Sequence, residues 1–472
     1  MDRVERVLSD LSPDIVIRDQ DVVSGYATDF RRQYEGRARA VLRPRNTGEV
    51  QEIVRSCASH GVGLVPQGGN TSYCAAATPD RDGSELLLSL ERMTRVREID
   101  PLNLSVTVDA GIILGDLQRA VDDVELMFPL ALGSHQSCRI GGNLSTNAGG
   151  VNVVRYGMTR DLVLGLEVVL PDGTLFSELG PLRKNNTGYD VKQLFIGAEG
   201  TLGVITGASF KLARKPRQIV TAMLAAPEIA SLGSMLESAQ TWTGGAVTSF
   251  EFISRASQEL LKRADPALRH PLPETCDHLV LMEVATPSPV LDMEEAMNGL
   301  FGELLARELI LDGTIAASEQ QRVDLWRWRE GIPEAEVHLG GSVKHDIAVR
   351  TSRLGAFIEA ASALVREEAQ DAILSIYGHV GDGNVHLNVL APSKAATAEF
   401  KQSFADRVSP KLYELASEMG GTFSAEYGIG RIHIDRLSRY GAPGKVQLMH
   451  AIKRALDPSA IMNPGKVVPA AQ

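Results

Sequence analysis

The sequence has few cysteines and no long apolar run. Its four cysteines, at positions 57, 74, 138 and 276, form no close-spaced pair, which argues against a disulfide framework and against a thiolate zinc site. Residues 1–6 are charged and lack the apolar core of a signal peptide. No uninterrupted apolar stretch is long enough to span a membrane. These features predict a cytoplasmic protein without a transmembrane segment.

The chain also lacks the basic excess that nucleic-acid binding requires. Its net charge is −11, whereas binding to phosphates needs a positive surface. Hydrophobic residues make up 44% and charged residues 23%, which are ordinary values for globular proteins. A chain of 472 residues exceeds what one core usually organises, so two or three domains are expected.

The stretch 140–150 reads Ile-Gly-Gly-Asn-Leu-Ser-Thr-Asn-Ala-Gly-Gly and contains no charge. Glycines at both ends let a backbone approach a bulky ligand, because they have no Cβ and tolerate positive φ. The Asn, Ser and Thr side chains between them donate and accept hydrogen bonds. Taken alone, the stretch is either an ordinary glycine-rich turn or a cradle for a pyrophosphate or a planar ring.

Two further glycine-rich polar segments favour the cradle. A capped helix over 46–57 precedes a buried strand at 62–66, and the strand leads into the loop 67–72. The other segment runs from 184 to 203. The loop 67–72 is not GxGxxG and no P-loop lysine follows it, so a nicotinamide Rossmann domain and an NTPase are disfavoured. Three such loops in one domain are best explained by convergence on one dinucleotide-like ligand.

The remaining sequence indicates a change of architecture near Lys215-Pro216-Arg217. Before this point, strands are expected at 86–90, 104–108 and 162–170, the last followed by a Pro-Asp-Gly turn, with a helix at 114–122. After it, strands at 219–224, 249–253 and 279–284 alternate with helices at 229–239 and 291–309. This alternation predicts an antiparallel sheet covered by helices. The chain from about residue 406 is mostly helical.

A histidine hairpin is expected in the second half of the chain. Strands at 375–380 and 385–389 would flank a Gly-Asp-Gly-Asn turn. His379 and His386 would then lie roughly opposite each other, and Asn388 would share the face of His386. Two imidazoles on one face can ligate a divalent metal, with a third ligand from elsewhere. The alternative is a hydrogen-bonded histidine pair in the core of the domain.

Several of these motifs together resemble one family. Segments 66–71, 140–150, 183–189 and 197–203 look like the FAD-binding domain of the vanillyl-alcohol oxidase flavoproteins. The segments 377–388, 426–430 and 463–466 are similar to its D-lactate, glycolate and D-2-hydroxyglutarate dehydrogenase branch. The resemblance spans nearly the whole chain in the right order.

The resemblance implies an α+β protein with three parts. Residues 1–215 would form the FAD-binding domain, 216–405 an α+β cap with an antiparallel sheet and the substrate site, and 406–472 a helical segment returning to the flavin. The first glycine-rich loop has no histidine that could attach the flavin, so FAD is expected to be non-covalent; His135 is the one histidine near such a loop. The expected FAD contacts are Pro66, Gly68, Gly69, Asn70, Thr71, Ser72, Pro129, Gly133, Ser137, Gly141, Gly142, Asn143, Thr146, Asn147, Gly149, Gly150, Glu199, Gly203, Ile205 and Asn463.

The resemblance also implies a metal and a substrate site. Glu426 matches the third metal ligand beside His379 and His386, although alone it would be an ordinary loop carboxylate. Zinc is the first candidate, with manganese or another divalent ion as alternatives. Arg329 and Lys344 match residues that hold substrate carboxylates, whereas most such cations merely face solvent. The sequence also departs from the family pattern. Pro333 stands at the position of a substrate-touching threonine, and the first loop reads Thr-Ser-Tyr instead of the common Thr-Gly.

The implied reaction is the oxidation of a D-2-hydroxy acid, similar to D-2-hydroxyglutarate or D-lactate, to the 2-oxo acid. The catalytic set would be Asn388 with either His345 or Tyr427 as the base, because Tyr427 replaces the histidine common in the family and has a high ordinary pKa. Adjacent strand residues point to opposite faces, so Lys344 and His345 would not both face the substrate without a bulge. A metal-bound hydroxide or water is the third candidate for the proton acceptor.

Electrons would leave to a protein or quinone, as in similar enzymes. The competing hypotheses are an oxidase of the same fold and a flavoprotein subunit without turnover. A homodimer is compatible with the resemblance.

Overall fold

The computed structural model describes residues 2–272, 276–394 and 397–469. The chain divides into two compact units. The first consists of Met1–Gly150, Gly157–Lys215 and Glu426–Gln472, and the second of Val151–Tyr156 and Pro216–Ala425. The expected boundary after residue 215 coincides with this division. The expected boundary after residue 405 does not, because residues 406–425 belong to the second unit, where α15 contacts strand β16.

In the described part of the first unit, the strands form three sheets, with orders β1-β2-β4-β3, β5-β6-β10-β8-β9 and β11-β7. Its strands are β1 Val16–Ile17, β2 Val41–Leu42, β3 Gly63–Gln67, β4 Glu85–Ser89, β5 Val96–Asp100, β6 Ser105–Asp109, β7 Leu126–Met127, β8 Val163–Val169, β9 Leu175–Glu178, β10 Val204–Lys211 and β11 Ala213–Arg214. Its α-helices are α1 Arg3–Asp10, α2 Gln20–Ala27, α3 Thr47–His60, α4 Leu114–Asp122, α5 Ile140–Thr146, α7 Thr159–Leu162, α16 Ile434–Tyr440 and α17 Pro443–Leu456.

Local sequence signals explain where α3 begins and ends and why strand β3 follows it. The Asn46 side chain accepts a hydrogen bond from the Glu49 N–H, and Gly61 ends the helix with a φ of 62°. The apolar residues of one helical face are buried, as the pattern predicts. Strand β3 follows and pairs in parallel with β4. The polar loop 68–72 therefore begins at the carboxyl end of a buried strand.

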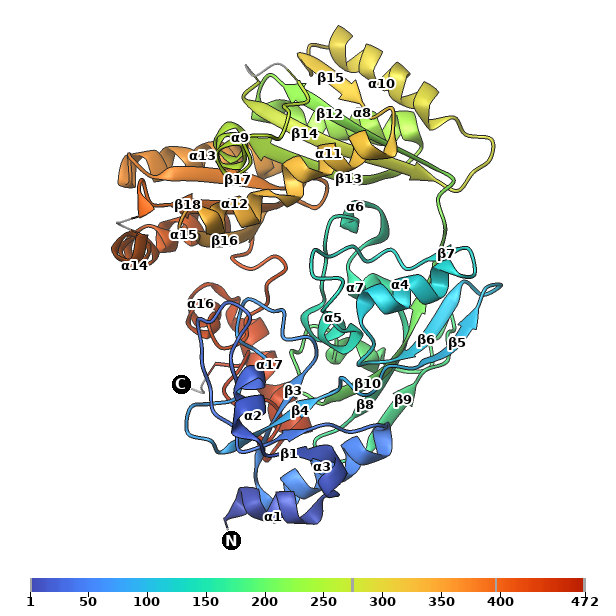
Figure 1. Ribbon diagram of the computed structural model, residues 1–472, viewed down its shortest axis with the longest axis vertical. Helices are drawn as coiled ribbons and strands as arrows, with labels where there is room; N and C mark the ends of the chain where they lie inside the picture. Colours follow the sequence, from blue (N-terminus) through green and yellow to red (C-terminus); the bar gives the residue numbers. More distant parts are fainter. Residues whose placement is uncertain (1, 273–275, 395–396, 470–472) are drawn as a thin grey trace. The chain divides into compact units, whose positions relative to one another are not determined.

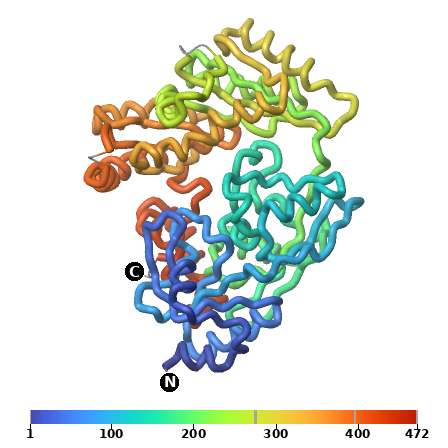
Figure 2. The backbone as a smooth tube through the Cα atoms, in the orientation of Figure 1, coloured from blue at the N-terminus to red at the C-terminus, as the bar shows by residue number. Residues whose placement is uncertain are grey.

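The C-terminal segment is part of the first unit (Figure 2). Met462 forms a bridge with Leu64, and the Asn463 N–H donates to the Leu64 carbonyl at 2.8 Å. Lys466 is fully buried and pairs with Glu85 of β4 at 3.1 Å. These contacts hold the Asn-Pro-Gly-Lys motif against the strand that leads to the first glycine-rich loop.

The second unit is built on a seven-stranded antiparallel sheet of order β15-β12-β14-β13-β17-β18-β16 (Figure 1). Its strands are β12 Gln218–Ala226, β13 Val247–Ser254, β14 His278–Thr286, β15 Asp312–Ile315, β16 Ser342–Ala348, β17 Ile373–His379 and β18 Asn384–Leu390. Its α-helices are α6 Val153–Tyr156, α8 Leu232–Thr243, α9 Arg255–Ala264, α10 Met293–Ala306, α11 Glu319–Glu330, α12 Ile332–His338, α13 Leu354–Glu368, α14 Thr397–Arg407 and α15 Ser409–Glu418.

Alternation along the strands separates two helical layers. Met223, Ile253 and Leu281 pack in one cluster with Trp328 of α11 and Ile332 of α12. The residues that alternate with these along the strands face the second helical layer. This layer contains α8 and α10, which lie side by side (Figure 1). The antiparallel sheet expected from the sequence is confirmed, and the site described below lies on the face covered by α11 and α12.

The hairpin β17–β18 has a register that differs from the expected one. Tyr377, not His379, is the partner of His386, and His379 pairs with Glu251 of β13. Gly378 has a φ of 148°, so the strand departs from regular geometry just before His379. The two histidines are therefore diagonal neighbours, with ring centroids 5.4 Å apart. Among the described residues, no helix is long and apolar enough to cross a membrane.

Candidate active site

Close backbone approaches and a hydrogen bond join the glycine-rich segments of the first unit. A Cβ at Gly69 would lie 2.2 Å from the Ser137 carbonyl oxygen, so only glycine allows the loop to pass residue 137. The Glu199 N–H donates to the Ser145 carbonyl at 2.8 Å. The stretch 140–150 differs from a simple loop, because residues 140–146 form the short helix α5 and Asn147 ends it with a φ of 50°.

Two features of these loops fit a flavin nucleotide. A Cβ added at Gly133 would meet no atom within 4 Å, and one added at Gly142 would meet only the Gly68 Cα, at 4.0 Å, so the backbone there is open to a close ligand. Among the described residues, the buried Asn463 Oδ1 accepts no hydrogen bond, while its Nδ2 donates to the carbonyls of Ala76 and Glu199. An amide with a fixed orientation and an oxygen that accepts no hydrogen bond from the protein can accept one from the polar edge of a flavin ring.

The other expected FAD contacts lie on the same segments. A Cβ added at Gly68 would lie 3.2 Å from the Gly142 nitrogen, and one added at Gly200 would contact Pro66. Glu199 is buried, and burial raises its pKa to about 7, although hydrogen bonds from the Ile429 and Gly430 N–H groups oppose this shift. The remaining expected contacts are distributed over the loop after β3, the α4–α5 connection, α5 with the residues that follow it, and the start of β10: Asn70, Thr71, Ser72, Pro129, Gly141, Asn143, Thr146, Gly149, Gly150, Gly203 and Ile205.

In the second unit, Glu251 joins two of the expected site residues. Its Oε1 accepts from His379 Nδ1 at 2.7 Å, and its Oε2 accepts from Arg329 Nε at 2.6 Å. Burial raises the pKa of Glu251, but the charges and hydrogen bonds of His379 and Arg329 outweigh it and hold the pKa at about 2. Arg329 also lies over the Tyr377 ring, 4.8 Å from its centroid.

The metal-ligand set expected from the sequence is brought together. Ligand atoms of His379, His386 and Glu426 lie within 4.8 Å of one another. The bond to Glu251 fixes a proton of His379 on Nδ1, so Nε2 is the nitrogen that would ligate a metal. Burial, together with the charges of His379, Arg329 and Lys344, lowers the pKa of His386 well below its usual value. A neutral imidazole is the form that binds metal, so this donor set fits a divalent ion.

Lys344 and Asn388 converge on a second buried carboxylate, Glu336 of α12. Lys344 Nζ lies 2.9 Å from Glu336 Oε2, and Asn388 Nδ2 donates to both carboxylate oxygens at 3.0 Å. Asn388 also contacts the Tyr377 hydroxyl at 3.1 Å. The face of the sheet therefore holds two cation–carboxylate pairs beside the histidines.

His345 is not brought together with these residues. It lies on the opposite face of β16, where Nδ1 is 2.7 Å from the Leu387 carbonyl and Nε2 is 2.8 Å from the Ser409 hydroxyl. No bulge interrupts β16 between Lys344 and Asp346, so strand alternation separates the two side chains.

Tyr427 follows Glu426, the expected third metal ligand, in the first unit. Its ring packs edge-on against Tyr73, with centroids 4.8 Å apart, and the Arg31 guanidinium lies 3.9 Å from the Tyr73 centroid. Pro333 lies in the first turn of α12, where the missing N–H costs no helical hydrogen bond.

Sequence reasoning missed three acidic residues of this site. Glu251 is the one charge in an apolar run, Ser-Phe-Glu-Phe-Ile, and a charge at a buried strand position is a usable signal. Glu336 lies in α12, the short helix that directly follows α11 and its Arg329, and it is buried together with Ile332 and Ala335. Asp346 accepts from Asn384 Nδ2 and from the Ala425 N–H, so it holds the turn and the chain before Glu426.

Comparison with known families identifies the family of this chain. The model of the C-terminal domain of FAD-linked oxidases matches residues 215–467, and the model of an FAD-binding domain matches residues 38–177. The chain belongs to the FAD-linked oxidase family and contains its FAD-binding domain. The resemblance drawn from the motifs is confirmed, and so is the assignment of the protein as an oxidoreductase that binds FAD.

Curated relatives specify the branch. A probable D-2-hydroxyglutarate dehydrogenase, mitochondrial, from Oryza sativa subsp. indica is 36% identical over 96% of this chain and 79% of its own length. A D-2-hydroxyglutarate dehydrogenase, mitochondrial, from Danio rerio is 36% identical over 97% of this chain and 84% of its own. A D-2-hydroxyglutarate dehydrogenase from Stutzerimonas stutzeri is 35% identical over 97% of both chains.

Solved structures confirm the fold class. Substrate-bound p-cresol methylhydroxylase matches with a TM-score of 0.76 and 17% identity, covering 98% of this chain and 96% of that one. An alkyldihydroxyacetonephosphate synthase matches with a TM-score of 0.74 and 16% identity, covering 98% and 86%. At this identity the likeness concerns the fold alone, which is the α+β architecture of the vanillyl-alcohol oxidase type.

The expectation of a cytoplasmic location was wrong by this comparison. The rice and zebrafish relatives, together with those of Arabidopsis thaliana and Bos taurus, are named mitochondrial. The expectation rested on composition near residue 1, and composition of a folded chain does not encode its compartment, because address signals are short segments outside the fold.

Proposed function

We propose that this protein oxidises a D-2-hydroxy acid to the 2-oxo acid, with FAD as hydride acceptor and a divalent metal beside the substrate. The observation that carries the proposal is the cluster of His379, His386 and Glu426 next to the Arg329–Glu251 pair. Metal ligands and a guanidinium on one sheet face provide the groups that a 2-hydroxy carboxylate needs. The relatives' names, D-2-hydroxyglutarate dehydrogenase, support the same chemistry.

Each residue of the cluster would have a defined task. His379, His386 and Glu426 would hold the metal, with zinc as first candidate, and a bound metal acts as a Lewis acid on a substrate oxygen. Bound FAD supplies hydride acceptance at flavin N5. Arg329 would bind the substrate carboxylate through its terminal amino groups, while Glu251 fixes the orientation of Arg329 and of His379. A base removes the hydroxyl proton, and electrons would leave to a protein or a quinone.

Anaerobic mixing with D-2-hydroxy acids tests the proposal directly. We expect the flavin absorbance of the purified protein to bleach with at least one member of a panel of D acids and not with the corresponding L acids. Readmission of air then separates dehydrogenase from oxidase, because an oxidase regains oxidised flavin rapidly without an added acceptor. A flavin that no D acid bleaches would identify a binding protein without turnover and overturn the proposal.

We also expect the FAD to be released on denaturation. No histidine lies in the first glycine-rich loop, and His135 Nδ1 is 3.2 Å from the Leu132 carbonyl within its own turn. Precipitation with acid should leave the yellow colour and the flavin fluorescence in the supernatant. Fluorescence that stays with the precipitated chain would show covalent attachment.

A further inference from the structure

Lys344 is already paired inside the protein. Its ammonium lies 2.9 Å from Glu336 Oε2, and Glu336 has no exposed surface. The Ser342 hydroxyl donates to the same oxygen at 2.8 Å, and Asn388 donates to both oxygens. Three side chains from two neighbouring strands, β16 and β18, are thus directed at one carboxylate of the protein.

Arg329 and Lys344, the cations beside the histidines, are compensated in the same way. Arg329 uses Nε for Glu251, which it shares with His379, and Lys344 faces Glu336. The guanidinium has further N–H donors in its fork, whereas an ammonium acts as a single point of charge. A guanidinium can bind a carboxylate in a forked geometry while it also pairs with a second carboxylate, but a substrate carboxylate that approached Lys344 would also approach the Glu336 carboxylate.

We infer that Glu336 occupies the place of a second substrate carboxylate and selects D-2-hydroxy acids whose far end carries no negative charge. This inference rests on the proposed function and specifies its substrate class. Like charges brought together in a desolvated site disfavour binding strongly, and a site whose donors are already committed offers no compensating hydrogen bonds. Glu336 is thus a specificity-determining residue, distinct from the residues that would hold the metal.

The matched substrates for a test are D-2-hydroxypentanoate and D-2-hydroxyglutarate, which have the same chain length and differ in the distal carboxylate. With an artificial electron acceptor, the unmodified holoenzyme should show a kcat/KM about tenfold or more higher for the monoacid. Glu336→Gln keeps the shape and the acceptor oxygen and removes the charge. It should move the ratio about tenfold towards the diacid, mainly through a lower KM for D-2-hydroxyglutarate.

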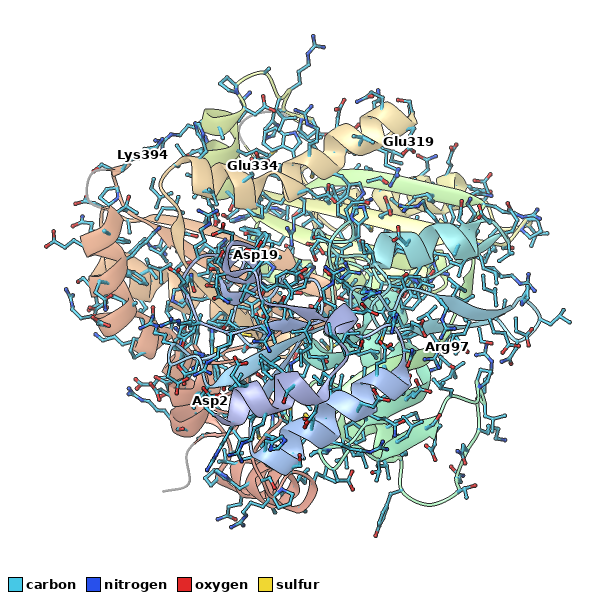
Figure 3. The ribbon with its side chains drawn as sticks, turned by 60° about the horizontal axis from the view of Figure 1, so that its bottom comes forward. Asp2, Asp19, Arg97, Glu319, Glu334 and Lys394 are labelled. Carbon is cyan, nitrogen blue, oxygen red and sulfur yellow. The ribbon has the colours of Figure 1, made fainter. Side chains whose placement is uncertain are left out.

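Glu334→Gln is the matched control. Glu334 (labelled in Figure 3) belongs to the same helix, α12, but is exposed to solvent, where its charge is screened, so the same change of charge there should leave the ratio of the two acids unaltered. Equal use of the two acids by the unmodified enzyme would overturn the inference, and so would a ratio that Glu336→Gln does not move.

Binding can be measured without turnover or a variant. Titration of the unmodified holoenzyme with 2-oxopentanoate and 2-oxoglutarate, followed by the flavin spectrum, should give tighter binding of the monoacid; equal or reversed affinities would contradict the role of Glu336 even if Glu336→Gln does not fold. Failure of the proposed function is distinguishable, because then no D acid of any kind bleaches the flavin, and the inference falls with it.

Discussion

His386→Ala should abolish turnover and metal binding while leaving FAD bound. His386 is buried, and burial with the neighbouring cations keeps its imidazole neutral and ready to ligate. With one of three protein ligands removed, the remaining pair of His379 and Glu426 cannot hold the ion. The flavin loops belong to the first unit and do not include this strand. Metal content by elemental analysis and flavin content by absorbance check both halves of the result.

Two further variants test whether the loss of activity is specific to the candidate metal ligands. His278→Ala removes an imidazole from β14, on the opposite face of the same sheet, and should keep metal and activity. Glu251→Gln leaves every ligand in place but weakens the hold on His379, so metal affinity should fall about 10- to 100-fold and activity should return at high metal concentration. Full activity of a metal-free preparation, or of His386→Ala, would disprove the metal's role.

Tyr427→Phe should slow flavin reduction about 10²- to 10⁴-fold in anaerobic single turnovers, the usual contribution of a general base. Tyrosine is a poor base at its ordinary pKa, but a nearby metal and cations lower the pKa of a phenol. Tyr427 directly follows Glu426, a candidate metal ligand, whereas the ring nitrogens of His345 contact the Leu387 carbonyl and the Ser409 hydroxyl, on the face of β16 opposite Lys344. The measurement is the rate of flavin bleaching after rapid mixing with a substrate.

His345→Asn is the companion variant and should change the bleaching rate little, although it should lower the melting temperature, because it alters a buried hydrogen-bonded side chain. A large loss of rate in His345→Asn with little loss in Tyr427→Phe would reverse the assignment. If neither variant slows the bleaching, a metal-bound hydroxide or water accepts the proton.

The sequence alone was sufficient to predict features that depend on neighbouring residues or on a motif. The cap of α3 at Asn46, the strand β3 and the hairpin turn before Asn384 all arise from local preferences, and the structure has each of them. The three glycine-rich loops and the two histidine-containing strands were recognisable as a family pattern, and comparison confirms the family.

Other features required the tertiary structure, because they depend on which strands become neighbours. Periodicity shows that Glu251 faces one side of a strand, but only the pairing of β13 with β17 brings it to His379. The two-residue offset between His379 and His386 follows from the strand register, in which Tyr377 is the partner of His386, and the spacing of the two histidines in the sequence does not reveal this register.

The pairing of the charges in the site also required the tertiary structure. Lys344 and Arg329 were identifiable as cations in the right motifs, yet their partners Glu336 and Glu251 lie on other elements and decide how much of each charge a substrate meets. Sequence thus determined the chemical class of this protein through residue types and local order. Packing of the sheet against α11 and α12 decided the charge balance, because electrostatic interactions depend on distance in space and on burial, not on separation along the chain.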